Sequence, residues 1–187
     1  MRSELEKHLP PLLALFLVIS LFWALNLTPW PNFLILFLGL AVGSFFLDVD
    51  HLIYWFFLKP NTQESRLAQA TFRQKDVKSL IKLLALTSKE HTNLIFHHYF
   101  FQVILALMSF FVFTSTTSIF IMAFLLASNV HLIVDEVTDL KHDKPHLQKW
   151  LFAREKKQLS LDYLRYYVLV FIFFSLLFLL LLIRFRS

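Results

Sequence analysis

The hydrophobic positions of this chain fall into five long runs, separated by connections that carry most of the polar residues. Each run approaches the roughly 20 mainly apolar residues that a membrane-spanning helix needs; the runs cover residues 9–27, 32–58, 93–114, 119–137 and 163–183. The first run is longer than the ~7–15 residues of a signal-peptide core, and no small-residue cleavage site follows it. The pattern predicts an all-α, polytopic membrane helical bundle with about five transmembrane helices, formed as one membrane domain over residues 1–187.

The connections between these runs are of two kinds, which predict the topology. Those at residues 28–31 and 115–118 are short and uncharged, whereas residues 59–90 and 141–165 each hold seven Lys or Arg. Because Lys and Arg concentrate on the cytoplasmic side, we expect a cytoplasmic N-terminus in a multi-pass protein of the inner (plasma) membrane. Five spans would place 16 of the 18 basic residues inside, and only Arg184 and Arg186 outside.

Both long connections contain apolar residues at helical spacing with Lys or Arg on the other face. In the first the apolar residues are Val77, Leu80, Ile81 and Leu84, and in the second they are Leu147, Trp150 and Leu151. We expect amphipathic helices on the inner leaflet, which either cover the bundle or steer lipid headgroups.

Composition narrows the chemistry that such a bundle can carry. Apolar residues make up 57% of the chain, with 23 Phe, a mean hydropathy of +0.61 and no Cys. Without Cys there is no disulfide and no thiolate metal site, so a metal would be held by His and carboxylate. The net charge is +5, but the basic residues flank membrane runs rather than forming a separate domain. We therefore expect membrane lipids as partners and no nucleic acid.

The first group of polar residues inside a run is Asp48-Val-Asp50-His51. A charged side chain at the centre of a membrane helix costs about 2.5–3.5 kcal/mol on insertion scales, so such groups usually pair, line a cavity or bind an ion. On a helix Asp48 and His51 share a face, whereas Asp50 points elsewhere unless the helix is broken there.

The second group is His91, His97 and His98, at the start of the third run. On one helix His91 and His98 would share a face but lie about 10 Å apart along the axis. One ion cannot easily reach both, although two metals or a bent helix start could.

The third group is His131-Leu-Ile-Val-Asp135, followed directly by Glu136. The i, i+4 spacing of His131 and Asp135 lets both side chains meet one ion, as in the paired His of zinc-protease helices. Glu136 lies on a different helical face.

The predicted topology places all three groups at similar depth near the cytoplasmic side. Helical bundles build metal sites in this way, from side chains on facing helices. Hydrogen-bonded packing histidines are the alternative, but no Lys or Arg lies within the second, third or fourth run to pair the acids. A metal site is therefore the favoured interpretation. We assign no role to His8. Pro145 and the polar residues around it predict a surface loop that contains His142 and His146.

These motifs resemble the YdjM family of membrane-bound metal-dependent hydrolases. That family carries a Gly-rich segment ending in Leu-Pro-Asp-x-Asp-His, then His-Arg-x-x-Thr-His-Ser, and later His-Leu-x-x-Asp. The matching segments, within about residues 39–139, are Gly43-Ser-Phe-Phe-Leu-Asp48-Val-Asp50-His51, His91-Thr-Asn-Leu-Ile-Phe-His97-His98 and His131-Leu-Ile-Val-Asp135. Leu47 replaces the Pro, and Phe96 stands at the second His of the middle motif, so a shift must bring in His97 or His98. The family is similar to zinc-dependent phospholipase C, which implies a phosphoester substrate.

The leading hypothesis is a membrane-embedded metal-dependent hydrolase of a phosphoester or phospholipid-like substrate at the cytoplasmic leaflet. One or two divalent metals, zinc first among them, would activate water and be held among Asp48, Asp50, His51, His91, His97, His98, His131 and Asp135. Asp50 or Glu136 could act as the catalytic base. The alternatives are a transporter for a divalent cation or protons, and a non-catalytic membrane protein stabilised by its metal.

Overall fold

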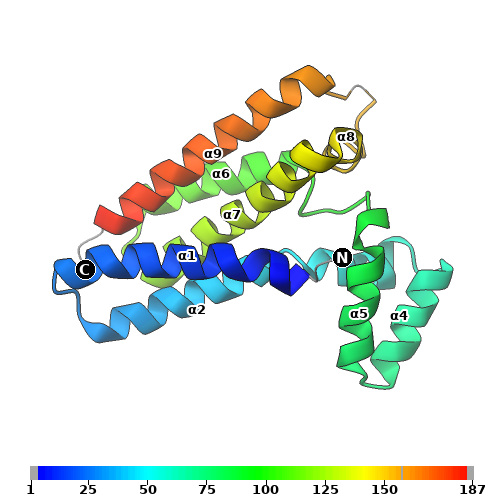
Figure 1. Cartoon of the computed structure of the whole chain (residues 1–187), viewed down its shortest axis with the longest axis horizontal. Helices are drawn as coiled ribbons and strands as arrows, with labels where there is room; N and C mark the ends of the chain where they lie inside the picture. The colour runs from blue at the N-terminus through cyan, green and yellow to red at the C-terminus, as the bar shows by residue number, and fades with distance from the viewer. Residues whose placement is uncertain (1–3, 157, 185–187) are drawn as a thin grey trace.

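The computed structural model of the chain describes residues 4–156 and 158–184, and these residues form helices and turns without any strand. Figure 1 shows a bundle of long helices with a smaller hairpin at one end. The long helices are α1 (Glu4–Leu25), α2 (Trp30–Phe46), α6 (Tyr99–Ser115), α7 (Ile119–His142) and α9 (Leu161–Arg184). The predicted all-α bundle is confirmed. Three of the basic residues used in the topology argument, Arg2, Lys157 and Arg186, lie outside the described residues.

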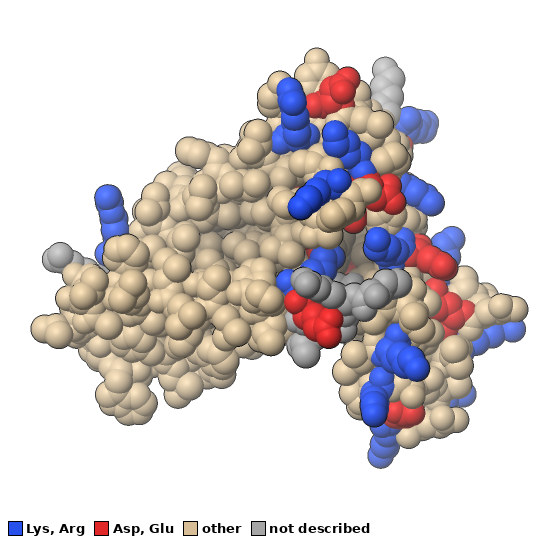
Figure 2. All heavy atoms as spheres, in the orientation of Figure 1, with Lys and Arg blue, Asp and Glu red and all other residues tan. Residues whose placement is uncertain are grey.

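The bundle has the surface of a membrane protein. Within the described residues, four segments are long and apolar enough to cross a bilayer: Glu6–Leu25, Trp30–Leu58, Ile119–His142 and Leu161–Arg184. The fifth long helix, α6, is also apolar but has 17 residues. Large apolar side chains point outward, with Leu17 66% and Phe111 69% exposed, as expected where lipid is the solvent. Charged side chains gather at the end of the bundle near α8 and the hairpin (Figure 2).

Helix α7 is the centre of the bundle and packs against α1, α2, α6 and α9. Its contact with α2 is unusually close because the only two glycines of the chain face it, four residues apart. A Cβ on Gly39 would lie 2.6 Å from the carbonyl oxygen of Phe120, and one on Gly43 would lie 2.9 Å from the Ala127 Cβ. Small residues at this spacing let two membrane helices approach backbone to backbone. The end of α2 is thereby held directly beside α7.

The second apolar run is one continuous stretch in sequence, but its helix is broken at Leu47 and Asp48. Helix α2 ends at Phe46, and the chain continues as α3 (Val49–Ile53) and a π-helix, η1 (Tyr54–Leu58). This break separates Asp48 from Asp50 and His51, which would otherwise follow one regular helix.

The third run, which we expect to begin at Asn93, becomes helical only at Tyr99. Asp50 provides the reason, since its carboxylate accepts the backbone N–H groups of residues 95, 96 and 97 at 3.0, 2.5 and 3.3 Å. Those amides are therefore bonded to a side chain instead of a helical carbonyl. His98 then caps α6 by accepting the N–H of Phe100. We call residues 91–98 the connector.

Two amphipathic helices, α4 (Gln63–Arg73) and α5 (Val77–Thr87), form an antiparallel hairpin that we call the arm. Thr62 and Asp76 cap them by accepting the N–H groups of Ser65 and Ser79. A 3-10 turn, η2 (Ser88–Glu90), leads from the arm to the connector.

The other predicted amphipathic segment forms the short helix α8 (Lys144–Leu151). The loop expected around Pro145 is thus helical, because Pro is tolerated in the first turn, where it removes no helical hydrogen bond.

Candidate metal centre

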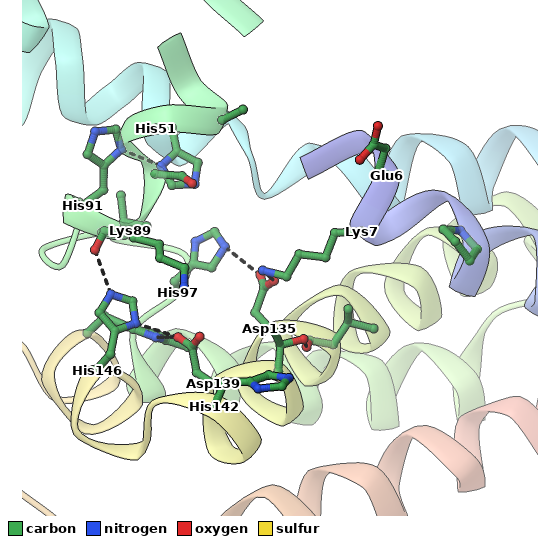
Figure 3. A pocket seen from close by; sticks show the side chains of 17 residues that line it. Glu6, Lys7, His51, Lys89, His91, His97, Asp135, Asp139, His142 and His146 are labelled. Atoms are coloured by element: carbon green, nitrogen blue, oxygen red, sulfur yellow. Dashed lines mark hydrogen bonds and ion pairs between the residues drawn. The ribbon is translucent and has the colours of Figure 1, made fainter. Parts of the chain in front are cut away.

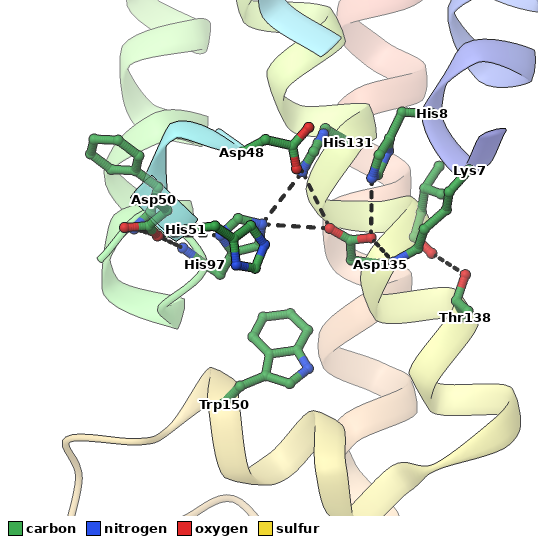
Figure 4. A network of polar contacts seen from close by, with 12 residues as sticks. Lys7, His8, Asp48, Asp50, His51, His97, His131, Asp135, Thr138 and Trp150 are labelled. Carbon is green, nitrogen blue, oxygen red and sulfur yellow. Dashed lines mark hydrogen bonds and ion pairs between the residues drawn. The ribbon is translucent and has the colours of Figure 1, made fainter. Parts of the chain in front are cut away.

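Three of the predicted ligands, His97, His131 and Asp135, point their side chains at one position in the bundle (Figure 4). Asp135 Oδ2 lies 3.3 Å from His131 Nε2 and 3.6 Å from His97 Nε2, and the two Nε2 atoms are 3.4 Å apart. Ligand atoms about 2.0–2.1 Å from a tetrahedral Zn²⁺ lie roughly 3.3–3.4 Å from one another. The three buried donors therefore have the spacing of one face of such a coordination sphere.

His131 comes from the middle of α7, and its ring is oriented by α2. Its Nδ1 lies 2.7 Å from the backbone carbonyl oxygen of Ser44. A carbonyl can only accept, so Nδ1 carries the proton and Nε2 keeps the lone pair that a metal needs. The close approach of α2 and α7 at Gly43 makes this hydrogen bond possible.

His97 comes from the connector, and Asp50 orients its ring in the same way. Its Nδ1 lies 3.3 Å from Asp50 Oδ2, so Nδ1 donates to the carboxylate and Nε2 faces the shared position. Histidines that bind metals commonly donate their second N–H to a carboxylate or a carbonyl. Since Asp50 also binds three backbone amides, it holds the connector and positions His97. Its carboxylate is thus engaged by the connector and by the His97 ring, and the ligand atoms that converge at the shared position come from other residues.

A second group of potential ligand atoms shares His131 and adds Asp48 and His8. Asp48 Oδ1 is 3.8 Å from His131 Nε2, and the His8 ring is stacked on the His131 ring with centroids 3.8 Å apart. His8 is buried, although the sequence indicated no role for it. Its position in the tail before the first apolar run gives no pattern that could have identified it.

Asp135 also has a cationic partner that the sequence did not predict. Lys7 Nζ forms an ion pair with Asp135 Oδ1, and His8 Nε2 lies 3.4 Å from the same oxygen. No Lys or Arg lies within the second, third or fourth run, but α1 brings this cation to Asp135. The two oxygens of Asp135 are thus divided, because Oδ1 faces α1 and Oδ2 faces His97 and His131.

His51 and His91 form a different kind of cluster, a hydrogen-bonded chain that ends at Glu64 of the arm. His51 Nδ1 lies 2.6 Å from His91 Nδ1, and His91 Nε2 lies 2.5 Å from Glu64 Oε1. Burial holds the pKa of His91 below its usual value, although Glu64 opposes this shift. Burial also disfavours the Glu64 carboxylate, but hydrogen bonds from Thr87, Trp55 and His91 outweigh it, and the pKa of Glu64 is lowered.

These directions assign the protons along the chain. An ionised Glu64 accepts from His91 Nε2, a neutral His91 accepts at Nδ1 from His51, and the His51 lone pair is then on Nε2. The sequence missed Glu64 because it lies in the arm, with no motif around it.

Two other predicted residues lie apart from these clusters. His98 caps α6 and its ring lies tilted against that of Tyr99, so the connector presents His97 rather than His98. Glu136 is buried on a neighbouring face of α7, near Gln102 and Tyr167. Neither is among the described residues that line the cavity next to the centre, which leaves Glu136 without access to a substrate there.

That cavity, of about 650 Å³, opens beside Asp135 and is lined by α1, α3, α5, η2, α7, α8 and the connector. His51, His91, His97 and Asp135 reach it, together with Lys7 and Lys89 (Figure 3).

Hydrogen bonds that join α7, α8 and η2 border the cavity on the side of α8. Asp139 accepts from His146 Nδ1 at 2.7 Å and from Trp150 Nε1 at 2.8 Å, and His146 Nε2 reaches the Lys89 carbonyl at 2.7 Å. The hydrogen bond to Asp139 raises the pKa of His146 above its usual value. His146 is therefore a structural residue at the rim and not a free surface histidine.

The structure thus brings six of the eight predicted ligands into one region, as two clusters rather than one. His97, His131 and Asp135 converge on one position with Asp48 beside His131, His51 and His91 form a hydrogen-bonded chain, and Asp50 and His98 hold the connector. The chain matches no protein-family model, no curated protein and no solved structure.

Proposed function

We propose that the chain is a membrane-embedded metal-dependent hydrolase that acts on a phosphoester of the phospholipid type at the cytoplasmic leaflet. The observation that carries the proposal is the 3.3–3.6 Å spacing of His97 Nε2, His131 Nε2 and Asp135 Oδ2. Asp48 is placed to complete the set after a small movement, since its Oδ1 is 3.8 Å from His131 Nε2. Two histidines with carboxylates, without any thiolate, are a donor set that suits zinc in a catalytic site.

A bound divalent metal supplies Lewis acidity and lowers the pKa of a water ligand, which is the chemistry that phosphoester hydrolysis needs. The protein holds its donors ready for this task, because Ser44 and Asp50 fix the tautomers of His131 and His97. His51 lines the cavity, and the chain through His91 to Glu64 leaves the lone pair of His51 on Nε2. We assign His51 the task of accepting the proton of the attacking water, in place of Asp50 or Glu136.

The surroundings of the centre favour an anionic substrate that comes from the membrane. The cavity lies at the end of the bundle where charged side chains gather, and Lys7 and Lys89 reach it. The concentration of Lys and Arg in the connections at this end supports the cytoplasmic side. A phospholipid headgroup would meet these cations while its acyl chains stay in the bilayer.

The first test is metal analysis of the purified protein. We expect at least one equivalent of zinc, and its loss in Asp48→Ala and in His131→Ala. Less than one equivalent in the parent, with both variants indistinguishable from it, would remove the basis of the proposal.

The second test uses the metal-loaded protein in vesicles. Headgroup or phosphate release from a phospholipid panel, abolished by His131→Ala, is the expected result. Metal binding without release from any lipid would instead favour a structural metal. Uptake of zinc into the vesicles that is abolished by the same substitutions would favour transport.

A further inference from the structure

The arm has an apolar face that no other part of the described chain covers. The principal contacts of α4 are with α5 and η1, and those of α5 are with α4 and η2. Small buried residues of α4, such as Ser65, Ala68 and Thr71, form its inner face. On α5, however, Val77 is 64% and Ile81 is 52% exposed.

Two exposed apolar residues of α5, Val77 and Ile81, belong to a stripe that leads to the cavity, whereas the exposed Leu86 lies on the opposite face. Val77, Ile81, Ala85 and Ser88 follow at intervals of four, four and three residues, which places them on one face of a helix. Ala85 and Ser88 line the cavity. Because the four residues share a face, Val77 and Ile81 point toward the side of the arm on which the cavity lies. This is the side that faces the bundle.

The arm also has the direction of a helix that lies on a membrane surface. In Figure 1 α4 and α5 run across the direction of the long helices, and α5 is the arm helix nearer the bundle. If the long helices cross the bilayer, the arm lies along its surface, with the stripe of α5 facing the lipid beside α1 and α2. An amphipathic helix in this position buries its apolar face about 5–10 Å into the boundary between headgroups and acyl chains.

The basic residues near the stripe indicate that the lipid is anionic. Lys78 and Lys82 are exposed one residue after Val77 and Ile81, so they lie about 100° further round the helix, at the border between the stripe and the polar face. Arg66, Arg73 and Lys75 are also exposed on the arm, where the acids are Glu64 and Asp76. Long basic side chains can lay their apolar stems along such a face and keep their charge among anionic headgroups.

We propose that the arm is a docking surface for the anionic leaflet of the membrane that the bundle crosses. The stripe of Val77 and Ile81 enters the leaflet, Lys78 and Lys82 bind its headgroups, and the end of the stripe at Ser88 opens the cavity to that leaflet. This docking does not depend on hydrolysis or on a bound metal.

The absence of Cys from the chain makes the test direct. Val77→Cys, Ile81→Cys and Ser79→Cys, each labelled with an environment-sensitive fluorophore, are reconstituted as full-length protein in vesicles with or without anionic lipid. Ser79 is the matched control, since it is exposed on the same turns of α5 but on the opposite face. Circular dichroism of each labelled protein verifies that the helices are retained.

We expect the labels at positions 77 and 81 to shift to shorter emission wavelengths in anionic vesicles and to be quenched by spin labels high on the lipid acyl chains. The label at position 79 should stay in water. Reversing both charges, with Lys78→Glu and Lys82→Glu, should cancel the shift at position 81.

Three results would overturn the proposal. Labels at 77 and 81 as accessible to water as the label at 79 would show that the stripe is not docked. A shift without quenching by lipid spin labels, rising with protein density, would show that a second copy of the chain covers the stripe. A shift that is equal in neutral vesicles and insensitive to charge reversal would show that anionic headgroups are not recognised.

Discussion

The two histidine clusters at the end of the bundle use the same residue types in opposite ways. In the cluster of His97, His131 and Asp135, the Nδ1–H groups are engaged by Asp50 and Ser44, and the lone pairs converge at 3.3–3.6 Å. In the chain of His51, His91 and Glu64, the nitrogens face each other and the lone pair of His91 is used in a hydrogen bond. The comparison teaches that the partner of the second ring nitrogen decides whether a buried histidine is available to a metal.

Removal of a convergent histidine should have the largest effect on metal binding. His97→Ala removes a ligand, and we expect zinc affinity to fall by more than about 100-fold, since loss of an outer hydrogen-bond partner alone costs 10–100-fold. His98→Ala is the matched control, because the adjacent ring only caps α6. Isothermal titration in detergent measures both, and equal losses in the two variants would refute the assignment of His97.

Asp50 accepts a hydrogen bond from His97, and Glu64 accepts one from His91. Substitution of these two carboxylates therefore gives a matched pair of variants. Asp50→Asn removes the carboxylate that accepts from His97, so we expect zinc affinity to fall by about 10–100-fold. Competition with a chromophoric chelator would measure the change. An unchanged affinity in Asp50→Asn would mean that the orientation of His97 does not depend on this hydrogen bond.

Removal of Lys7 should strengthen zinc binding instead of weakening it. It pairs with the Asp135 carboxylate and is only 28% exposed, so Lys7→Met removes a cation that competes with the metal. Partly exposed ion pairs are worth about 0.2–1 kcal/mol, and zinc should therefore bind about 1.4- to fivefold more tightly. Lys89→Met, at another lysine of the cavity, serves as the control. Weaker binding in Lys7→Met would show that Lys7 supports the ligand set instead.

Glu64→Gln should leave the metal centre nearly unaffected. Glu64 contacts His91 and Trp55, not the convergent donors, so we expect zinc affinity within about twofold of the parent, in contrast to the 10–100-fold effect of an orienting partner. Loss of its carboxylate should lower the melting temperature, because His91 and Trp55 lose an ionised acceptor. A loss of zinc affinity comparable to that of Asp50→Asn would erase the distinction between the clusters.

The smallest effect concerns His146, which closes the rim away from both clusters. Its pKa is raised mainly by the hydrogen bond to Asp139, so protonated His146 is favoured in the folded protein. The stability that this adds is full below the unfolded value of about 6.5 and is lost as pH rises through the higher folded value. The melting temperature of the parent should therefore exceed that of His146→Gln most at acidic pH, measured with chelator present.

His142→Gln, at an exposed neighbour in the same part of the chain, provides the control for this pH dependence. A difference between the parent and His146→Gln that grows with rising pH would contradict the stated sign.

Several features of the fold and site follow from the sequence by itself. The long apolar runs predict the helices, because a chain in lipid must satisfy its backbone hydrogen bonds within each helix. The i, i+4 spacing of His131 and Asp135 fixes their shared face through helix geometry alone. The helical spacing of Val77 and Ile81 likewise predicts an amphipathic α5, which the structure contains.

Only the tertiary structure decided how the remaining groups are used. The helix is interrupted at Leu47 and Asp48, so Asp48 lies beside His131 while His51, expected on the same face, bonds to His91, and sequence spacing cannot foresee such an interruption. Lys7 and His8 reach Asp135 because α1 packs on the bundle, across more than a hundred residues of sequence. Periodicity reports the face of one helix, whereas a ligand set depends on how several helices are placed, and that placement is decided by packing such as the close contact at Gly39 and Gly43.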